Sequence, residues 1–264
     1  MKLNKLYLLT TVSALAVMLC SCNREKPYNI NGTLDLPEQI PFGDTVITVP
    51  SFEDTWVYLL NFDQTPIDST QIHDNAFSFT GSIKPSDAYY VQLVSQIGSA
   101  LLVIEPGDID VYIDGNIKVT GTPANDCIAD VDAAIDDLNN ATYDHYAVIS
   151  DSLRELGEEV TEEQQKAIYD DMKLAMAHIV DSIYEANKDN KGAVYATLML
   201  LSDARSSEEF EQRLAKYPAE IREDALLKST VDMMHYYEMM QNVDLSGEDP
   251  AVADSFSTVA VDVE

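Results

Sequence analysis

The residues best suited to chemistry lie together near the end of the chain, in the segment Met233–Met240. This segment concentrates thioether and imidazole groups in the order Met-Met-His-Tyr-Tyr-Glu-Met-Met. His235 and Met239 are four residues apart, which places them on one face of a helix. Soft ligands of this type select Cu(I), so one interpretation is a metal site at His235 and Met239. The other is a packing face, because methionine fills irregular cores.

No other motif assembles a catalytic set. The sequence contains no His-Glu-x-x-His zinc motif, no Gly-x-Ser-x-Gly nucleophile and no glycine-rich phosphate loop. Asp108, Asp110 and Asp114 lack the spacing of a calcium loop, and alternation along a strand puts them on one solvated face. His178 lies off the apolar stripe of its expected helix and should be solvated. We therefore assign no catalytic residue and no cofactor.

Two of the expected strands in the N-terminal half carry pairs of aromatic residues. The pairs are Trp56 with Tyr58, and Tyr89 with Tyr90. Together they could form a stacking platform for sugars. Aromatic side chains more often supply the bulk of a core, and that is the expectation here.

The cysteines indicate attachment rather than redox chemistry. Leu19-Cys20-Ser21-Cys22 closes the apolar run Leu6–Leu19, which follows Lys2 and Lys5. The run is shorter than the ~20 residues of a membrane-spanning helix and suits a signal peptide. Leu19 stands three residues before Cys22, and the small residue Ser21 stands directly before it. This arrangement resembles the bacterial lipobox, in which the signal is removed and the cysteine is acylated. This resemblance implies a lipid anchor at Cys22, and the alternative is an ordinary secretory signal.

Cys127 is then the remaining thiol of the mature chain. It belongs to no Cys-x-x-Cys motif, and a lone cysteine in an oxidising compartment is either buried or a reactive exception. Acidic neighbours raise the pKa of a thiol. We therefore expect Cys127 to be inert.

The charge of the chain limits its partners. It has 46 acidic and 16 basic residues, and a formal net charge of -30. Nucleic acids bind proteins through Lys and Arg, so nucleic acid is excluded as a partner. Anionic lipid headgroups are repelled as well, and the membrane should be reached through the acyl chains. The tether after Cys22 lacks the acidic run that marks surface export in some bacteria. An outer-membrane anchor facing the periplasm is thus favoured over display on the cell surface.

Residues 28–122 have the pattern of an all-β domain, with short apolar segments between Gly, Pro, Asn and Asp. Asp74-Asn75 and Asp114-Gly115-Asn116 tolerate the positive φ of tight hairpins. Both faces of Thr55–Phe62 are apolar, which predicts cover on both sides. The pattern predicts an antiparallel β-sandwich with strands at Ile30–Leu36, Thr45–Val49, Thr55–Phe62, Ile67–Ile72, Phe77–Ile83, Tyr89–Val94, Leu101–Ile104, Ile109–Ile113 and Ile117–Thr120.

Short motifs in this half resemble a known family. They are Asn31-Gly32-Thr33-Leu34, Ile67-Asp68-Ser69-Thr70, Phe77-Ser78-Phe79-Thr80-Gly81, Ile104-Glu105-Pro106-Gly107 and Val119-Thr120-Gly121-Thr122. As a set they are similar to the domain of unknown function 4369, which typically opens lipoproteins of Bacteroidota. The resemblance covers Tyr28 to Thr122. In many relatives a helical region then leads to a thioredoxin-like thiol-disulfide oxidoreductase domain with a Cys-x-x-Cys site. The sequence to Glu264 has no such motif, so the resemblance implies no redox activity.

The pattern becomes helical at Thr122-Pro123, where Thr suits an N-cap and Pro a first helical residue. One helix should run to about Tyr146, with a short helix near Asp151–Leu156. A capping box at Thr161–Gln164 opens a long helix, and a second box at Ser206–Glu209 opens another. Gly192–Leu201 is apolar nearly all round and should be buried. The whole predicts a bundle of five or six helices. The long helix has a stripe made of Ile168, Met172, Met176, Ile179 and Ile183.

These observations predict an α+β protein with five parts. They are a lipoprotein signal peptide (1–21), a lipidated tether (22–27), a β-sandwich (28–122), an α-helical domain (123–241) and a flexible acidic tail (242–264). Within the tail, Ser255–Val263 alternates like a strand.

The function expected from the sequence is that of a lipid-anchored, non-catalytic binding or scaffolding module of the cell envelope. Its partners would be the membrane, an envelope protein that it could recruit, and a ligand that the sequence does not identify. One alternative is an accessory of envelope thiol-disulfide exchange that lacks its own redox site. Another is a Cu(I)-binding periplasmic lipoprotein.

Overall fold

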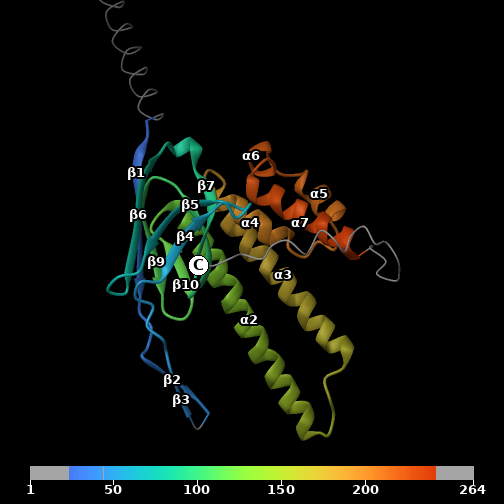
Figure 1. Cartoon of the computed structure of the whole chain (residues 1–264). Coiled ribbons are helices and arrows are strands. Elements are labelled where there is room, and N and C mark those ends of the chain that lie inside the picture. The colour runs from blue at the N-terminus through green and yellow to red at the C-terminus, as the bar shows by residue number, and fades with distance from the viewer. Residues whose placement is uncertain (1–23, 44, 242–264) are drawn as a thin grey trace, which may run out of the picture.

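The computed structural model describes residues 24–43 and 45–241, in which a β-rich part is followed by a helical part (Figure 1). This order confirms the predicted α+β class. The strands are β1 (Lys26–Leu34), β2 (Gln39–Phe42), β3 (Thr45–Thr48), β4 (Trp56–Leu60), β5 (Pro66–Gln71), β6 (Ala76–Ile83), β7 (Tyr89–Ser95), β8 (Gly98–Ile104), β9 (Gly107–Ile113) and β10 (Ile117–Thr120), with a 3-10 turn η1 (Pro85–Asp87). The helices are α2 (Pro123–Glu155), α3 (Glu162–Asn187), α4 (Gly192–Leu201), α5 (Ser207–Leu214), α6 (Ala219–Arg222) and α7 (Ala225–Gln241).

Two four-stranded sheets form the sandwich, in the orders β10-β9-β1-β6 and β5-β4-β7-β8. Their inner faces share one core, because apolar residues alternate with polar ones along each strand. The predicted antiparallel arrangement holds for these sheets except between β1 and β9, which pair in parallel. Along β9, Asp108 and Asp110 are exposed while Ile109 and Val111 are buried. The predicted solvated aspartate face is confirmed.

The predicted strands are all present, with shifted ends, and one strand was missed. β2 contains Pro41 and pairs only with β3, in a two-stranded sheet separate from the sandwich. Proline removes a donor from the ladder and confines a strand to an edge. Its four residues therefore gave no strand signal in the sequence.

The predicted tight turn between β5 and β6 is confirmed. Asp74 and Asn75 have φ angles of 53° and 59°, and His73 exchanges two backbone hydrogen bonds with Ala76, each of 2.9 Å. Positive φ at both central residues is the conformation that matches the twist of a two-residue hairpin. This turn carries the chain from the edge of one sheet to the edge of the other.

The first helix differs from the prediction, since α2 continues without a break through Glu155. No glycine or proline lies between Pro123 and Gly157, and Gly157, with φ 75°, follows the helix end. The predicted break near Tyr146 was therefore wrong. With α3, this helix forms a long arm that extends beyond the sandwich (Figure 1).

Helix α3 opens with the predicted capping box at Thr161 and Gln164. Its predicted apolar stripe is only partly covered. Ile179 is exposed, and Val180 is the buried residue of the helix instead. Helix α4 is buried as expected, and it packs with the other helices and with the sheet residues Tyr90 and Val103.

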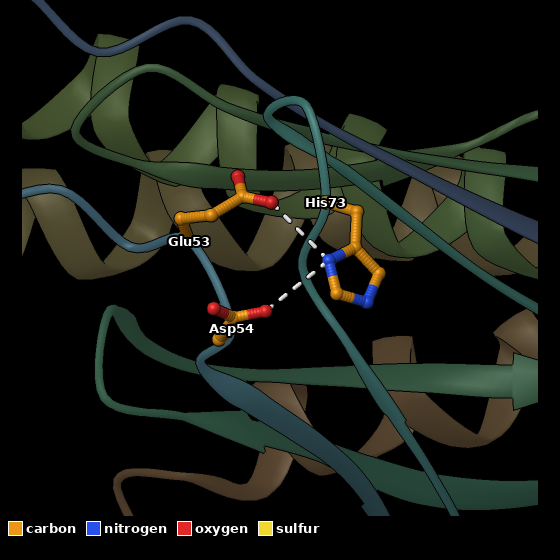
Figure 2. A group of neighbouring side chains, drawn as sticks. All are labelled: Glu53, Asp54 and His73. Atoms are coloured by element: carbon orange, nitrogen blue, oxygen red, sulfur yellow. Dashed lines mark hydrogen bonds and ion pairs between the residues drawn. The ribbon is translucent and has the colours of Figure 1, made fainter.

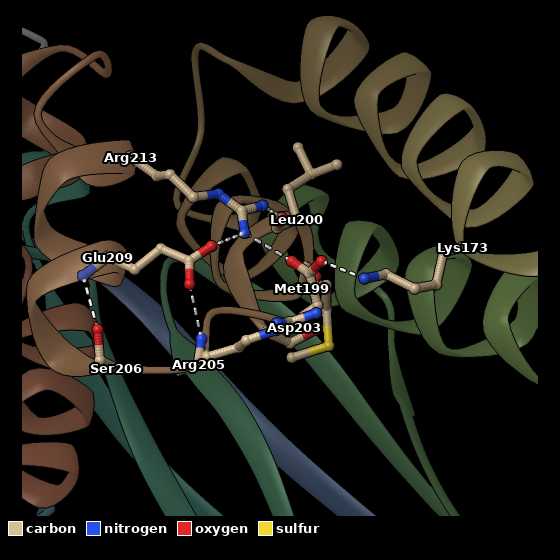
Figure 3. A network of polar contacts seen from close by, with 9 residues as sticks. Lys173, Met199, Leu200, Asp203, Arg205, Ser206, Glu209 and Arg213 are labelled. Carbon is tan, nitrogen blue, oxygen red and sulfur yellow. Dashed lines mark hydrogen bonds and ion pairs between the residues drawn. The ribbon is translucent and has the colours of Figure 1, made fainter. Parts of the chain in front are cut away.

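Asp203 joins three helices near the end of α4 (Figure 3). Its carboxylate accepts hydrogen bonds from Lys173 of α3 at 2.6 Å and from Arg213 of α5 at 2.7 Å. Arg213 also donates to the carbonyl of Leu200 at 2.6 Å. The hydrogen bond from Lys173, and then that from Arg213, lowers the pKa of Asp203.

In the second predicted capping box, the Glu209 carboxylate bonds to the residue before the N-cap Ser206 rather than to Ser206 itself. The Ser206 hydroxyl accepts from the backbone N–H of Glu209 at 3.1 Å, as predicted. The Glu209 carboxylate, however, accepts from the backbone N–H of Arg205 at 3.0 Å. Figure 3 shows both bonds. Ser206 thus caps the start of α5, and Glu209 bonds back to the chain just before it.

Among the described residues, none of the helices combines the length and the apolar character that crossing a membrane requires.

Candidate functional site

The outer face of the sheet β5-β4-β7-β8 is divided into two halves. On β7 and β8 it carries Tyr90 and Val103, which are buried against the helices. On β4 it carries Trp56 and Tyr58, which face solvent. We call these the covered half and the bare half.

In the covered half, the Tyr90 hydroxyl lies at the first turn of α4. It donates to the backbone carbonyl of Lys191 and accepts from the backbone N–H of Tyr195 at 3.2 Å. It therefore bridges two groups at the usual helical spacing of four residues. Burial, and then the charge of Asp224, raises the pKa of Tyr90 above its usual range, which keeps this hydroxyl protonated.

Asn125 closes the edge of the same sheet. Its side-chain amide accepts from the backbone N–H of Val103 at 2.8 Å and donates to the carbonyl of Val103 at 2.9 Å. It also donates to the Thr122 hydroxyl at 2.8 Å. The amide thus satisfies both backbone groups at a buried position of the edge strand β8. The Glu105 carboxylate adds a bond from the backbone N–H of Ala124 at 2.7 Å.

In the bare half, Trp56 is 47% exposed and Tyr58 is 37% exposed, while Val57 and Leu59 between and after them are 0% exposed. The two rings stack, with centroids 6.2 Å apart and planes 25° apart. The expectation that these aromatics belong to the core is wrong for Trp56 and Tyr58. It is confirmed for Tyr90, and Tyr89 is half-buried against the sandwich core.

A shallow groove of about 430 Å³ runs beside the aromatic pair. Register places Gln71 opposite Trp56 and Ser69 opposite Tyr58 on the next strand. Besides Trp56 and Tyr58, the residues that line the groove are Glu53, Asp54, Thr55, Val94, Ser95 and Gln96. The groove therefore combines two ring faces with amide, hydroxyl and carboxylate groups.

One rim of the groove carries Glu53 and Asp54, which lie just before β4. They approach His73, which lies at the turn between β5 and β6 (Figure 2). The Nδ1 atom of His73 lies 3.2 Å from a Glu53 carboxylate oxygen and 3.4 Å from an Asp54 carboxylate oxygen. All three side chains are exposed. The sequence gave no signal for this group, because His73 is twenty residues from Glu53 and belongs to no motif.

A second hollow of about 430 Å³ lies between the sandwich and the helices. Its wall includes Phe62, Tyr89 and Lys191, and the Lys191 ammonium forms an ion pair with the buried carboxylate of Asp224. This pair connects the start of α4 to the start of α7. The hollow is thus part of the joint between the two parts of the molecule.

The Met- and His-rich segment lies on the last described helix, α7. His235 is exposed, as are Met233, Met239 and Met240. The packing interpretation is therefore wrong for these residues, although Met234 does pack against the core. His235 and Met239 share a helix face open to solvent, and Cu(I) binding there stays a prediction.

Cys127 is buried in the first turns of α2. Burial, and then the charge of Asp130, raises the pKa of its thiol to about 11. A thiol that is protonated and buried is a poor nucleophile, which agrees with the expected inertness. His178 is exposed on α3, as predicted. Cys20, Cys22 and the predicted strand Ser255–Val263 lie outside the described residues.

A family model, the domain of unknown function DUF4369, matches residues 28–128. The match covers the sandwich and continues into the start of α2, where Asn125 and Cys127 lie. That boundary agrees with the contacts, since the first turn of α2 is bonded to β8 through Asn125. No curated protein and no solved structure matches the chain.

Proposed function

We propose that this protein is a lipid-anchored, non-catalytic binding protein of the cell envelope, and that the bare half of its outer sheet face binds a glycan. The observation that carries the proposal is the exposed, stacked pair of Trp56 and Tyr58 on a strand whose opposite face is fully buried. Large exposed aromatics that the fold does not use for packing mark binding surfaces.

The chemistry around the pair suits a polyhydroxyl ring. Flat aromatic faces stack on the apolar face of a sugar, while Ser69, Gln71 and Gln96 offer neutral donors and acceptors for hydroxyls. The nearby carboxylates of Glu53 and Asp54 accept hydrogen bonds from hydroxyls and repel anions. A neutral glycan therefore fits the groove better than a phosphate or an acidic peptide.

The membrane attachment in this proposal rests on Cys22. The basic residues, apolar run and lipobox-like tetrapeptide occur in order, and acyl chains contribute ~0.8 kcal/mol for each methylene buried in a bilayer. Mass spectrometry of protein from its native host tests this part by itself. The expected result is a diacyl or triacyl mass on an N-terminal Cys22, and an unmodified soluble product cut elsewhere would contradict it.

Trp56 is the single tryptophan of the chain, so intrinsic fluorescence reports on the bare half directly. Tag-free protein treated with EDTA is titrated with short cello-, chito-, malto- and xylo-oligosaccharides. We expect one class to shift the emission of Trp56 and to show saturable binding by calorimetry. Tyr58→Ala should weaken that binding at least about tenfold, or ~1.4 kcal/mol. Tyr143→Ala, which removes a 73% exposed tyrosine on α2, should leave it unchanged. Equal affinity in the two variants, or no binding of any class, would contradict the glycan proposal.

Cu(I) binding by α7 is a second candidate, favoured by the exposure of His235 and Met239 on one face. Titration with Ag(I) of wild type, His235→Ala and Met239→Ala tests it, and identical isotherms would contradict it. The accessory role in thiol-disulfide exchange also stays a prediction. A pull-down with envelope thioredoxin-like proteins tests that role, against a control that carries only the N-terminal leader and tether.

A further inference from the structure

Two carboxylates converge on one ring nitrogen at the rim of the groove (Figure 2). His73 Nδ1 faces both Glu53 and Asp54 at 3.2 Å and 3.4 Å. One ring N–H aligns well with one acceptor only, so a hydrogen bond explains one of these two contacts and leaves the other unexplained. The second carboxylate brings a like charge close to the first, in a chain that already has a net charge of -30.

We infer that Glu53, Asp54 and His73 form a binding site for a divalent transition-metal cation such as Zn²⁺. Among the described residues, this is the set of three or more His, Cys, Asp or Glu side chains whose donor atoms all lie within 4.8 Å of one another. Ligand atoms around tetrahedral zinc, at about 2.1 Å from the ion, lie about 3.4 Å apart. The two distances from His73 Nδ1 match that spacing.

Imidazole with carboxylates selects the class of ion. Calcium and magnesium prefer all-oxygen ligand sets, whereas one imidazole nitrogen with two carboxylate oxygens suits Zn²⁺ and other imidazole-binding metals. A cation there neutralises the two carboxylates and leaves coordination positions open to solvent, since all three side chains are exposed.

The donors are held by paired backbone rather than by free loops. The N–H of Asp54 donates to the carbonyl of Ile72 at 2.9 Å, next to His73. The second oxygen of Glu53 accepts from the backbone N–H of Asp74 at 3.1 Å. This bond orients the carboxylate toward His73, as outer partners do for metal ligands.

Asp54 lies two residues before Trp56, and both Glu53 and Asp54 line the groove beside the aromatic pair. A bound cation would therefore offer coordination to a ligand lying on the aromatic pair. Metal binding itself does not depend on the proposed glycan function, and the two are measured separately: the metal titration contains no sugar, and the sugar titration contains EDTA.

The test is calorimetric titration of tag-free protein with Zn²⁺, in the wild type and in four variants. His73→Ala and Asp54→Asn remove a ligand, and Asn tolerates the φ of 61° at position 54 as well as Asp does. The matched controls are His178→Ala and Asp110→Asn, which remove an exposed histidine and an exposed aspartate elsewhere. We expect one-to-one binding, at least tenfold weaker in the first two variants and unchanged in the controls.

Fluorescence gives a second readout of position. Ni²⁺ quenches a nearby indole, so it should quench Trp56 in wild type and in His178→Ala but not in His73→Ala. Absence of Zn²⁺ binding, or equal weakening in His73→Ala and His178→Ala, would overturn the inference. Circular dichroism of each variant shows whether the fold is kept, because a folded His73→Ala protein with wild-type affinity contradicts the site directly.

Discussion

The two halves of one sheet face show what the same pattern of aromatic residues can do in different surroundings. Tyr90 and Tyr58 both lie on the outer face of the sheet β5-β4-β7-β8. Tyr90 is 4% exposed and its hydroxyl bridges the first turn of α4. Tyr58 instead stacks with Trp56 in the open. The difference arises because the helices pack over β7 and β8 and leave β4 and β5 uncovered.

This contrast separates structural aromatics from aromatics that are available for a ligand. A side chain in the covered half should matter for stability, because its polar atoms are buried and bonded. A side chain in the bare half should matter little for stability and much for binding. Four changes test this division, from the largest expected effect on the free energy of unfolding to the smallest.

Asn125→Ala should have the largest effect. It leaves the backbone N–H and carbonyl of Val103 buried without partners, which costs about 3 kcal/mol in unfolding free energy. Urea denaturation measures it, with Asn139→Ala on the exposed side of the same helix as the control. If Asn125→Ala lowers the unfolding free energy no more than Asn139→Ala does, the bonds between Asn125 and Val103 do not stabilise the packing of α2 on the sheet.

Tyr90→Phe should be next. It keeps the ring but removes the bridge between the Lys191 carbonyl and the Tyr195 N–H, at a cost of about 2 kcal/mol. Tyr112→Phe is the matched control, because its exposed hydroxyl donates to Asp35 at 2.6 Å and exposed bonds of this kind contribute little. If both variants lose the same stability, burial does not distinguish the two hydroxyls.

Asp203→Asn weakens the helical cover without touching the sheet, and should destabilise by about 1 kcal/mol at neutral pH. The pKa of Asp203 is lowered in the folded protein by Lys173 and Arg213. Its contribution is therefore fully present above the unfolded value of about 3.9, and is lost as pH falls through the lowered folded value. Denaturation curves from pH 6 down to pH 3 should converge for wild type and variant. A constant difference would show that the charge of Asp203 is not involved.

Trp56→Phe with Tyr58→Phe should have the smallest effect on stability, below about 1 kcal/mol, because an aromatic ring remains at both positions and the two side chains are 47% and 37% exposed. Thermal unfolding of the double variant checks this. A loss comparable with that of Tyr90→Phe would place the pair among the packing residues and remove the basis for a binding surface.

The parts of the fold that follow from local pattern were predictable. Alternation along the strands and the Asp74-Asn75 turn depend on neighbouring residues alone, and so does the capping box at Thr161. The continuous helix α2 could have been predicted as well, because no glycine or proline lies between Pro123 and Gly157, although our prediction placed a break near Tyr146.

The candidate site required topology. The two-residue period shows that Trp56 and Val57 face opposite ways, but it does not show which strands the helices cover. Asn125 reads as an ordinary residue of a helix start, and its partner Val103 is 22 positions away on a sheet edge. His73 meets Glu53 because β4 and β5 pair antiparallel, with Trp56 opposite Gln71, which brings the start of one strand beside the end of the other. These contacts depend on how distant segments pack, which no local pattern encodes.

The most direct test of the bare half as a ligand surface is the emission of Trp56 during titration with oligosaccharides. Binding on the aromatic pair predicts a saturable blue shift, which Tyr58→Ala reduces and Tyr143→Ala preserves. An emission spectrum that does not change while calorimetry reports saturable glycan binding would place the ligand elsewhere on the molecule and contradict the account.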